Sequence, residues 1–571
     1  MSRLKNITRP SFLYILTGTA FGIHTVIVQI LAMREFFVIA RGNELMVGIF
    51  YFTWFAGIVT GARAGSLVHA RIRNPQKIAA SLLIIQAVLL PVIIIFIRVL
   101  RLLFNVPPGE YIPYFLFWLG TVFTLFPFSF LTGLNFPLLC NALNRLNIRN
   151  TIPIGRIYTA DSSGSILGGV VFTFILVSIL NSFAVAFLSS ALLLVCVWAI
   201  SKSESGKRAF NGKASVFLCI LIIIALITPL NNLLQKNSSL LRWKSFAPGF
   251  ELVDEENTPY QHLSLAERQE QYNLLTNGRF ASSFPDPYYT AEQVHFIMTF
   301  CPNTERILIL GLGNPEILTE LLQYPVKTID YVEVDREALP FIEPYLTDDI
   351  RKALDGGRVN IHHTDARVFV RNLVKQSREE NQHVQYDAVW LNLPEPETAD
   401  INRFYTADFY ADLLSVMKHR GVLITGVSSA VNYYGEAVSN YIQSIYKSLT
   451  HVFGEVKATP GTTMYFFASP SSGNITLDPE NLAKRFQHRK IRTKYFSPWH
   501  FSSVLEPFQV RLVEKELNEN LEEVPLNLDV HPVSYLYNME LHAGREGENE
   551  AFWLGWIKKI HLAHAIVFLV I

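Results

Sequence analysis

The sequence predicts an α-helical transmembrane bundle, followed by a small β domain and a doubly wound α/β domain, and three observations lead to this prediction. Half of the 571 residues are hydrophobic and only 17% are charged, and the apolar residues concentrate before residue 235. Polar and apolar residues then alternate around turn signals over 250–284, as in a β-meander. From Arg306 onward, short apolar runs alternate with segments of helical periodicity, which is typical of a parallel sheet covered by helices.

Changes of composition along the chain give the expected domain boundaries. The bundle occupies 1–235, the small β domain 246–286, and the α/β domain 287–470, with a mixed C-terminal extension over 471–550. Residues 551–571 begin a further membrane segment that stops before it is long enough to cross, so the chain reads as truncated.

Within the bundle, about seven apolar stretches approach the roughly 20 residues that a bilayer crossing needs. They are Phe12–Met33, Leu45–Gly61, Ala79–Phe104, Pro113–Leu138, Ile166–Leu180, Phe183–Ile200 and Val216–Leu234. Glycines recur at four-residue spacing, as at Gly57, Gly61 and Gly65, which lets helices pack closely in lipid. We therefore expect a multi-pass protein of the inner membrane, with the lipid bilayer as a partner.

Polar side chains inside these stretches include His24, Gln86 and Asn135. An ionisable group within a membrane is a candidate functional residue, but for His24 we favour a structural histidine that hydrogen-bonds to a neighbouring helix. No acidic or basic relay accompanies His24 within the spans, so the sequence does not predict a transporter.

Lys and Arg residues set the expected orientation. The N-terminus and the second, fourth and sixth connections are basic, so the N-terminus should be cytoplasmic. Seven complete crossings would place the later domains outside the cell, whereas a re-entrant pair around Asn181 would keep them inside. Lys236, Arg242 and Lys244 leave the direction of the last stretch open. We favour a cytoplasmic α/β domain.

A βαβ unit at Arg306–Asp335 organises the α/β domain. A short apolar run ends in Gly311 and Gly313, a helical segment follows, and the apolar run Ile329–Val334 carries Glu333 at its end. The glycines let the backbone approach a nucleotide, and an acid 20 residues after Gly313 can accept the ribose hydroxyls. Because only GxG is present, an ordinary strand-turn-helix is the alternative, and both NAD and S-adenosylmethionine fit as ligands.

Further elements extend this unit into a doubly wound sheet. We expect strands at Arg358–Thr364, Ala388–Leu391, Val422–Val427, Val456 and Met464–Ala468, with helices at Ala407–His419 and Glu436–Val452. Ligands of such sheets bind beyond the carboxyl ends of the strands. The residues expected there are Gly311, Gly313, Glu333, Asp365, Asn392 and Glu395.

Several classes of site are disfavoured by composition. A net charge of +1 without a basic face argues against nucleic acid as a partner. Four cysteines without a CxxC pair predict neither a zinc site nor a disulfide framework. His362 and His363 are adjacent and point to opposite faces of a strand, so no metal is expected.

The order of short motifs over about Leu252–Ser469 then points to a family. The motifs are Tyr260-Gln261, Asn277-Gly278, Gly311-x-Gly313, Glu333-x-Asp335, Asp365-Ala366, Tyr386-Asp387, Asn392–Pro396 and Phe409-Tyr410. In this order they resemble the spermidine synthases, polyamine aminopropyltransferases with a small β domain ahead of a methyltransferase-like Rossmann domain. Arg34–Gly48, Gly155–Gly169 and Pro525–His542 resemble segments of the membrane-fused bacterial forms.

This resemblance implies decarboxylated S-adenosylmethionine as donor, or S-adenosylmethionine itself, and no metal. The residues that it assigns to the donor are Gln261, Gly311, Gly313, Glu333, Asp365 and Ala366. Glu333 would bind the ribose, and Asp365 would bind the adenine amino group.

The acceptor side departs from the family pattern. Asn314 and Asn277 stand where the family has Asp, the motif around Tyr288–Glu292 is incomplete, and the Asp that deprotonates the attacking amine aligns with Asn392. An amide can neither hold the ammonium nor take its proton, and losing a positioned base costs about 10²–10⁴-fold in rate. Glu395 keeps its charge and could serve as a substitute base.

Three functions stay open at this point. The first is an aminopropyltransferase-type enzyme with a less cationic amine acceptor, with Asn392 and Glu395 at the acceptor. The second is a nucleoside-binding sensor or transport-linked membrane protein without this chemistry, and the third is a methyltransferase acting on a lipid-soluble acceptor. The resemblance also allows a homodimer.

Overall fold

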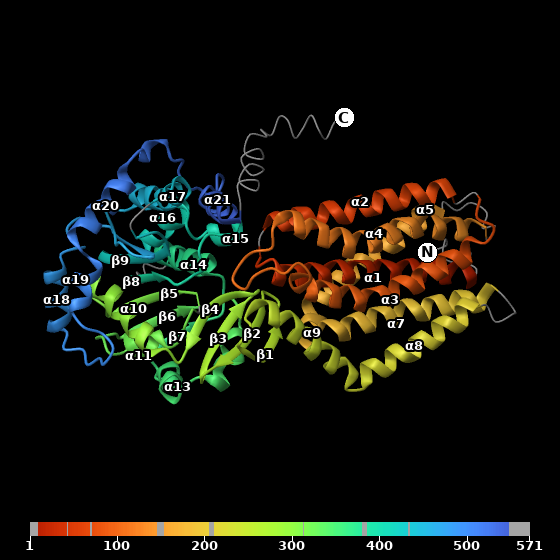
Figure 1. Cartoon of the computed structure of the whole chain (residues 1–571), viewed down its shortest axis with the longest axis horizontal. Helices are drawn as coiled ribbons and strands as arrows, with labels where there is room; N and C mark the ends of the chain where they lie inside the picture. Colours follow the sequence, from red (N-terminus) through yellow and green to blue (C-terminus); the bar gives the residue numbers. More distant parts are fainter. Residues whose placement is uncertain are drawn as a thin grey trace. The chain divides into compact units, whose positions relative to one another are not determined.

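The computed structural model describes residues 9–42, 44–68, 71–145, 153–204, 210–311, 313–379, 385–431 and 434–546 (Figure 1). The chain divides into two compact units. Unit 1 comprises Met1–Ser264 and Thr276–Arg279, and unit 2 comprises Leu265–Leu275 and Phe280–Ile571. The further membrane segment expected at 551–571 lies outside the described residues.

Long apolar helices make up most of unit 1. They are α1 (Arg9–Ile39), α2 (Glu44–Val68), α3 (Pro75–Leu103), α4 (Tyr114–Asn144), α5 (Pro153–Val171), η2 (Phe172–Leu176), α6 (Val177–Ile179), α7 (Ser182–Glu204), α8 (Phe210–Ile227) and α9 (Leu230–Phe246). Among the described residues, six helices are long and apolar enough to cross a membrane: α1 to α4, the run Ile154–Ile179 and α7. α8 and α9 pass the same test only as a pair, which is bent by 74°.

The bend between α8 and α9 falls at Thr228 and Pro229, inside the expected span Val216–Leu234. Proline has no backbone N–H to donate and its ring crowds the preceding turn, so a helix breaks or kinks there. On the two sides of Asn181, the run Ile154–Ile179 and α7 are each counted as a span of their own, so the bent pair lies at Pro229 and not at Asn181.

Glycines bring pairs of helices in the bundle into backbone contact. A Cβ built on Gly61 of α2 would lie 2.8 Å from the carbonyl carbon of Phe130, and one on Gly133 of α4 would lie 2.9 Å from that of Ile58. Gly22 of α1 faces the backbone of α5 in the same way. The close packing predicted from the glycine spacing is therefore confirmed.

The small sheet has the strand order β1-β2-β3-β4. Its strands are β1 (Glu251–Asn257), β2 (His262–Arg268), β3 (Gln271–Thr276) and β4 (Arg279–Phe284). Asn277 and Gly278 connect β3 to β4 with φ angles of +49° and +74°, the positive values that a tight hairpin turn requires. The predicted small β domain and its Asn-Gly turn are confirmed.

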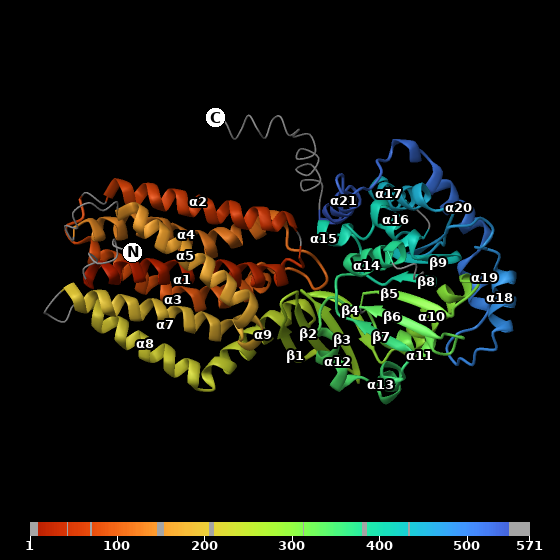
Figure 2. The ribbon, with the colours of Figure 1, turned by 180° about the vertical axis from the view of Figure 1, so that it is seen from behind.

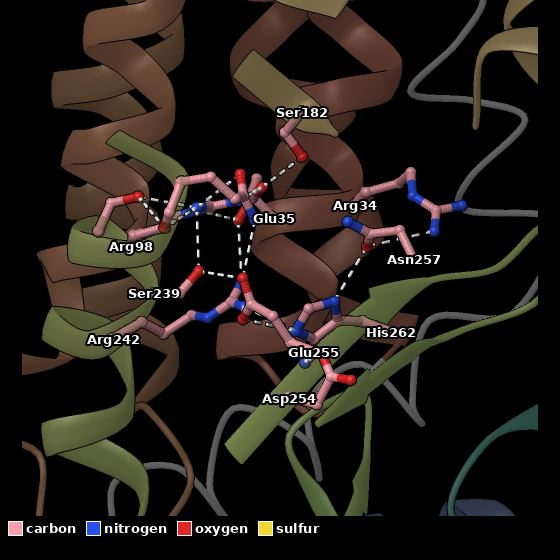
Figure 3. A network of polar contacts seen from close by, with 12 residues as sticks. Arg34, Glu35, Arg98, Ser182, Ser239, Arg242, Asp254, Glu255, Asn257 and His262 are labelled. Carbon is pink, nitrogen blue, oxygen red and sulfur yellow. Dashed lines mark hydrogen bonds and ion pairs between the residues drawn. The ribbon is translucent and has the colours of Figure 1, made fainter. Parts of the chain in front are cut away.

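Five charged or titratable side chains of unit 1 form a buried network (Figure 3). Glu35 of α1 accepts hydrogen bonds from Arg98 of α3 at 2.6 and 2.9 Å and from Arg242 of α9 at 3.0 Å. Arg242 also donates to Glu255 of β1 at 2.9 Å and lies 2.6 Å from Nε2 of His262 on β2. The network therefore ties the first two strands of the small sheet to three helices.

This network corrects the expectation that no acidic or basic relay lies within the spans, although it does not involve His24. Glu35 and Arg98 both lie in helices counted as spans, and they are 4% and 0% exposed. Nδ1 of His24 lies 3.1 Å from Oγ of Ser189 on α7. The hydrogen bond to a neighbouring helix, which was the simpler interpretation of His24, is confirmed.

Strand β1 lies near the C-terminal end of α1, far from the N-terminus of that helix. α1 has 31 residues, so it is about 46 Å long. Glu35, close to the C-terminal end of α1, belongs to the network that contains Glu255 of β1. If α1 crosses a bilayer, its N-terminus and β1 therefore lie on opposite sides.

Unit 2 contains a seven-stranded sheet with the order β10-β11-β9-β8-β5-β6-β7 (Figure 2). The strands are β5 (Arg306–Leu310), β6 (Thr328–Val332), β7 (Val359–His362), β8 (Tyr386–Leu391), β9 (Met417–Ser428), β10 (Glu455–Ala458) and β11 (Thr463–Ser469). β5 to β9 pair in parallel, whereas β11 pairs antiparallel with β9 and with β10. The predicted Rossmann domain of the methyltransferase-like kind is confirmed.

Helices cover this sheet in two groups. In the first group, α11 (Ile317–Leu321) packs against α10 (Pro287–Phe300) and α13 (Asp348–Asp355). In the second group, α16 (Ala407–Ser415) packs against α14 (Ala366–Glu379) and α17 (Glu436–Val452). The helix expected to reach His419 ends at Ser415, because Met417 already pairs with Tyr386 in the parallel ladder of β9 and β8.

The C-terminal part of the chain packs on unit 2. Its helices are α18 (Pro479–His488), α19 (Trp499–Val504), α20 (Pro507–Asn518) and α21 (Ser534–Glu546). Val513 and Leu517 of α20 join the hydrophobic core that contains Leu308 and Leu310 of β5. Arg489, just after α18, donates to the carbonyl oxygen of Met298 near the end of α10 at 2.8 Å.

Candidate functional site

Gly311 and Gly313 follow β5 and take backbone conformations that favour glycine. Their φ angles are +101° and +49°. A Cβ built on Gly311 would lie 2.5 Å from the carbonyl oxygen of Asn392, and one built on Gly313 would lie 2.8 Å from Cγ of Asn392. The glycines thus let the turn after β5 approach the residue that follows β8. The structure brings these three predicted site residues together.

Glu333 follows β6, the neighbour of β5. Its backbone N–H donates to the carbonyl oxygen of His362 at 3.0 Å, so pairing with β7 continues past the end of β6. One carboxylate oxygen accepts the N–H of Asp335 at 2.8 Å. Gly311 donates to the carbonyl oxygen of Val332 at 2.9 Å, which places Glu333 beside the glycine turn.

Asp365 lies directly before α14, and Ala366 is the first residue of that helix. Oδ1 of Asp365 accepts the N–H groups of Arg367 at 2.9 Å and Val368 at 3.1 Å, as a helix N-cap does. Oδ2 accepts from the guanidinium of Arg403 at 2.6 Å. The carboxylate is thus fixed in orientation and already ion-paired.

The side chain of Asn392 contains a buried atom that lacks a partner. Its Nδ2 forms no hydrogen bond in the described part of the chain, although it is shielded from solvent. Buried donors without an acceptor cost free energy, and such atoms are typical of sites that accept a ligand or water. Nδ2 faces Gly313, so this unsatisfied donor lies at the glycine turn.

Glu395, by contrast, is held by hydrogen bonds from two later elements. One carboxylate oxygen accepts from the backbone N–H of Ser428 at 2.9 Å and from the hydroxyl of the same residue. The other accepts from the hydroxyl of Tyr441 on α17 at 3.1 Å. Burial and the nearby Glu395 carboxylate raise the pKa of Tyr441 well above its usual range, so the phenol stays a donor.

Asn314 uses its amide in a way that a carboxylate could not. Its Nδ2 donates to the carbonyl oxygen of Ser283 at 3.0 Å, and its Oδ1 accepts the N–H of Glu316 at 3.0 Å. The buried Glu316 carboxylate accepts from the N–H of Asp286 at 2.6 Å, and burial raises the pKa of Glu316. A second carboxylate at position 314 would face both a carbonyl oxygen and an acid.

Gln261 belongs to unit 1, whereas the other predicted donor residues belong to unit 2. It lies in the turn between β1 and β2, where its N–H donates to Oγ1 of Thr258 at 3.0 Å and its carbonyl oxygen accepts the N–H of Thr258 at 2.9 Å. Oδ1 of Asn277 accepts the N–H of His262 at 2.9 Å, so Asn277 joins its own turn to β2.

Sequence reasoning missed Arg403, Ser428 and Tyr441 as partners of the predicted site residues. Ser428 ends β9, so the rule that ligands gather at strand ends could have found it. Arg403 and Tyr441 lie 38 and 46 residues from the carboxylates that they contact, and no local pattern marks them.

The charges at the strand ends are unevenly distributed. The ends of β6 and β7 carry the carboxylates Glu333 and Asp365, whereas the turns after β5 and β8 carry the amides Asn314 and Asn392. Carboxylates suit the hydroxyls and the amino group of a nucleoside. On the side of β5 and β8, Glu395 remains as a carboxylate three residues after Asn392. Within the described ranges, no group of three or more His, Cys, Asp or Glu residues could hold a metal ion.

Comparison with known proteins agrees with this geometry. Residues 287–473 match the family model of the spermine/spermidine synthase domain. The polyamine aminopropyltransferase 2 of Aquifex aeolicus (strain VF5) is 26% identical over 322 residues, which are 56% of this chain and 61% of the relative. The polyamine aminopropyltransferase of Saccharolobus solfataricus is 29% identical over 213 residues, which are 36% of this chain and 66% of the relative.

Solved structures give a weaker match. The crystal structure of spermidine synthase from Thermotoga maritima is 17% identical with a TM-score of 0.37, and the match covers 47% of this chain and 87% of that one. The chain spans about three fifths of the length of the first curated relatives, 61% and 57%. The resemblance seen in the sequence motifs is confirmed by the family match to residues 287–473.

Proposed function

We propose that this chain, in which residues 287–473 form a domain of the spermine/spermidine synthase family, transfers an aminopropyl-type group from decarboxylated S-adenosylmethionine to an amine. The observation that carries the proposal is the approach of Gly311 and Gly313 to Asn392, beside Glu333. A cradle of this kind, with a carboxylate at the next strand end, suits an adenosyl ligand. The related proteins of Aquifex aeolicus and Saccharolobus solfataricus are named polyamine aminopropyltransferases, which supports the reaction class.

In the proposed reaction, the acceptor nitrogen attacks the aminopropyl carbon that is bound to the sulfonium sulfur. The carbon–sulfur bond breaks, its electron pair stays on sulfur, and methylthioadenosine leaves as the neutral product. The acceptor must first lose the proton of its ammonium form, because only the free amine has the lone pair for attack. This chain therefore needs either a base at the acceptor or an acceptor with a lower pKa than a polyamine.

The acceptor site is proposed to be altered relative to the family. Asn392 replaces the expected carboxylate, and Asn314 donates to a carbonyl oxygen as only an amide can. Fewer negative charges weaken the attraction of a di- or tricationic amine. Glu395 is the carboxylate nearest in sequence that can take the proton, and it would have to exchange a hydrogen bond from Ser428 or Tyr441 to do so.

The test uses the purified full-length chain with decarboxylated S-adenosylmethionine and amines that carry one, two or three charges. We expect methylthioadenosine release with the least charged amines and a product that gains an aminopropyl group. Glu333→Gln should weaken donor binding, because the amide cannot accept two ribose hydroxyls as the carboxylate does. Glu395→Gln should lower turnover about 10²-fold or more without changing donor affinity, if it is the base.

Asn392→Asp is the complementary variant. It restores a carboxylate of nearly the same shape, so turnover with polycationic amines should rise while donor affinity stays within a few-fold. Donor binding without methylthioadenosine release from any amine would reject the transferase. A product that gains only a methyl group would select a methyltransferase instead.

A second candidate function is a nucleoside-binding membrane protein without transfer chemistry. The observation that favours it is that Glu395 is already held by three hydrogen bonds, which leaves it less free to act as a base. Donor affinity that depends on Glu333, without turnover by the unaltered chain or by Asn392→Asp, would support this function.

Membrane topology separates the two functions. The six apolar helices support a multi-pass membrane protein, and a transferase needs its α/β domain in the cytoplasm, where the donor is made. Because α1 places its N-terminus and β1 at opposite ends, a cytoplasmic α/β domain requires an N-terminus on the outer side, against the basic connections. For the transferase, we therefore propose that the α/β domain is cytoplasmic.

Labelling of cysteines introduced at Asn481 and Arg71 in sealed cells tests this cytoplasmic placement. An extracellular Asn481 would favour the second function.

A further inference from the structure

Helix α9 buries several polar residues and exposes three of its leucines. The buried residues of this helix are Asn231, Ser238, Ser239, Arg242, Trp243, Ser245 and Phe246, five of which are polar. Leu230, Leu233 and Leu241 are instead 44%, 53% and 40% exposed. A helix at a water-covered surface shows the reverse pattern, with its apolar stripe toward the core.

The buried polar side chains of α9 form ion pairs and hydrogen bonds with other elements of unit 1 (Figure 3). Arg242 pairs with Glu35 and Glu255, and Ser238 accepts a hydrogen bond from Arg98 at 2.8 Å. These contacts fix the rotation of α9 about its axis. Leu230, Leu233 and Leu241 therefore cannot turn inward without breaking a buried ion-pair network.

The preceding helix, α8, indicates what covers the exposed leucines of α9. α8 exposes large apolar side chains along its length, among them Phe217 at 63% and Ile227 at 75%. α8 has 18 residues and is about 27 Å long, close to the roughly 30 Å of a bilayer core. The exposed leucines of α9 continue this apolar surface after a bend of 74° at Pro229.

Two lysines stand on the same outer side of α9. Lys236 and Lys244 are exposed, and neither forms an ion pair with any residue that the structure describes. Lysines that flank exposed leucines on one helix face are typical of helices at the membrane interface, where the ammonium groups reach the phosphates. A helix at 74° to a crossing helix lies close to the membrane plane.

We propose that α8 crosses the bilayer and that α9 lies in its interface, with Leu230, Leu233 and Leu241 among the acyl chains and Lys236 and Lys244 on anionic phospholipid headgroups. The occupant of this surface is the lipid bilayer itself. The buried network of Glu35, Arg98 and Arg242 then lies just beneath the headgroups, on the side from which the small sheet leaves the bundle. This inference does not depend on the proposed enzymatic function.

The first test measures the depth of α9 in the full-length chain reconstituted into liposomes of phosphatidylcholine and phosphatidylglycerol. A fluorophore is attached to Leu233→Cys or Leu241→Cys in a Cys219→Ser background, since the other three cysteines are buried. Phe217→Cys on α8 and Asn481→Cys on α18 serve as the deep and aqueous controls. Lipids brominated near the headgroup, lipids brominated near the chain end, and aqueous iodide are compared as quenchers.

We expect the α9 labels to be quenched several-fold more by the shallow bromines than by the deep ones, with the reverse order for Phe217→Cys and iodide alone acting on Asn481→Cys. Deep quenching of the α9 labels equal to that at Phe217→Cys would overturn the proposal, because α9 would then complete the crossing. Quenching by iodide alone, or by no quencher, would show that water or a protein partner covers the leucines and would equally overturn it.

The second test concerns the lysines. Lys236→Gln with Lys244→Gln should lower the preference of the protein's lipid annulus for phosphatidylglycerol over phosphatidylcholine, measured with spin-labelled lipids, by about fivefold for each lysine. Lys484→Gln with Lys515→Gln removes two exposed charges elsewhere and should leave the preference unchanged. An unchanged preference in the α9 variant would reject the contact with headgroups.

Discussion

Gly313 and Asn392 approach each other closely enough that no larger residue than glycine fits at position 313. We expect Gly313→Ala to lower donor affinity at least tenfold, because the new methyl group would overlap the Asn392 amide and force the turn after β5 open. Calorimetric titration of the full-length chain with decarboxylated S-adenosylmethionine and methylthioadenosine checks this.

Gly357→Ala is the matched control for that substitution. Gly357 also has a positive φ, +72°, but a Cβ there meets nothing within 4 Å. It should therefore cost about 1 kcal/mol of stability from backbone strain alone and leave donor affinity unchanged. Equal losses of affinity in both variants would mean that strain rather than the approach to Asn392 is responsible.

Asn314 and Asn392 are the amides that follow β5 and β8, and the structure gives them different surroundings. Asn314→Asp should destabilise the fold by about 1–3 kcal/mol, because the carbonyl oxygen of Ser283 loses a partly buried donor and faces the new carboxylate instead. Asn392→Asp removes no hydrogen bond among the described residues and should change stability much less. Thermal unfolding of both variants distinguishes them, and similar losses would contradict this division.

At the scale of elements, the buried network makes the junction of α1, α3, α9, β1 and β2 sensitive to acid. Arg242 donates to Nε2 of His262, so Nδ1 carries the proton and lies 3.0 Å from Oδ1 of Asn257. Burial and the neighbouring Arg242 guanidinium hold the pKa of His262 well below its usual range. Glu255 faces the same groups, and although burial alone would raise its pKa, Arg242 and Arg98 bring it below the usual value.

The resulting pH dependence has a definite sign. Above about pH 6.5, His262 is neutral in both the folded and the unfolded chain, and its contribution to stability is complete. As the pH falls below that value, only the unfolded chain takes up the proton, so the free energy of unfolding falls by up to about 1.4 kcal/mol per pH unit. Hydrogen exchange of β1 and β2 between pH 7.5 and 5.5 should show the loss.

His262→Gln provides the control for this prediction. A glutamine can accept from Arg242 and donate to Asn257 without titrating, so its exchange rates, corrected for intrinsic chemistry, should vary little between the two pH values. An equal pH dependence in the wild-type chain and in His262→Gln would assign the effect to another group.

At the scale of the whole molecule, the C-terminal helices belong to the fold of unit 2. Val513 and Leu517 of α20 are fully buried in the core beneath the sheet, and burying two such side chains contributes about 3–6 kcal/mol. Arg367, next to Ala366, forms two hydrogen bonds to Asp529 at 2.9 and 2.7 Å, so the segment before α21 also supports the start of α14.

We therefore expect a chain that ends after Ser469 to lose donor binding and to aggregate, because it exposes this core. A chain that ends after Glu546 retains α18 to α21 and should bind the donor as the full-length chain does. Size-exclusion chromatography and calorimetry of both variants check this, and a monodisperse, donor-binding chain ending after Ser469 would contradict it.

Features that depend on a residue's own backbone preference, or on short-range periodicity, were predictable from the sequence. The Asn277-Gly278 turn, the glycine turn at Gly311 and Gly313, and the positions of the strands of the large sheet along the chain are of this kind. Short apolar runs, glycines at positive φ and acids at strand ends are local patterns, and they place the candidate site at the ends of β5 to β8. The sequence also determined that much of the chain before residue 235 is apolar enough for membrane spans.

The tertiary structure alone decided which side chains became partners. Glu35 pairs with Arg98 across 63 residues, Asp365 pairs with Arg403, and Glu395 is held by Ser428 and Tyr441. It also decided that Arg242 and the serines of α9 turn inward, which leaves Leu230, Leu233 and Leu241 exposed. An ion pair or hydrogen bond forms between elements that become neighbours only when the chain folds, and no periodicity within one segment encodes the position of its future neighbour.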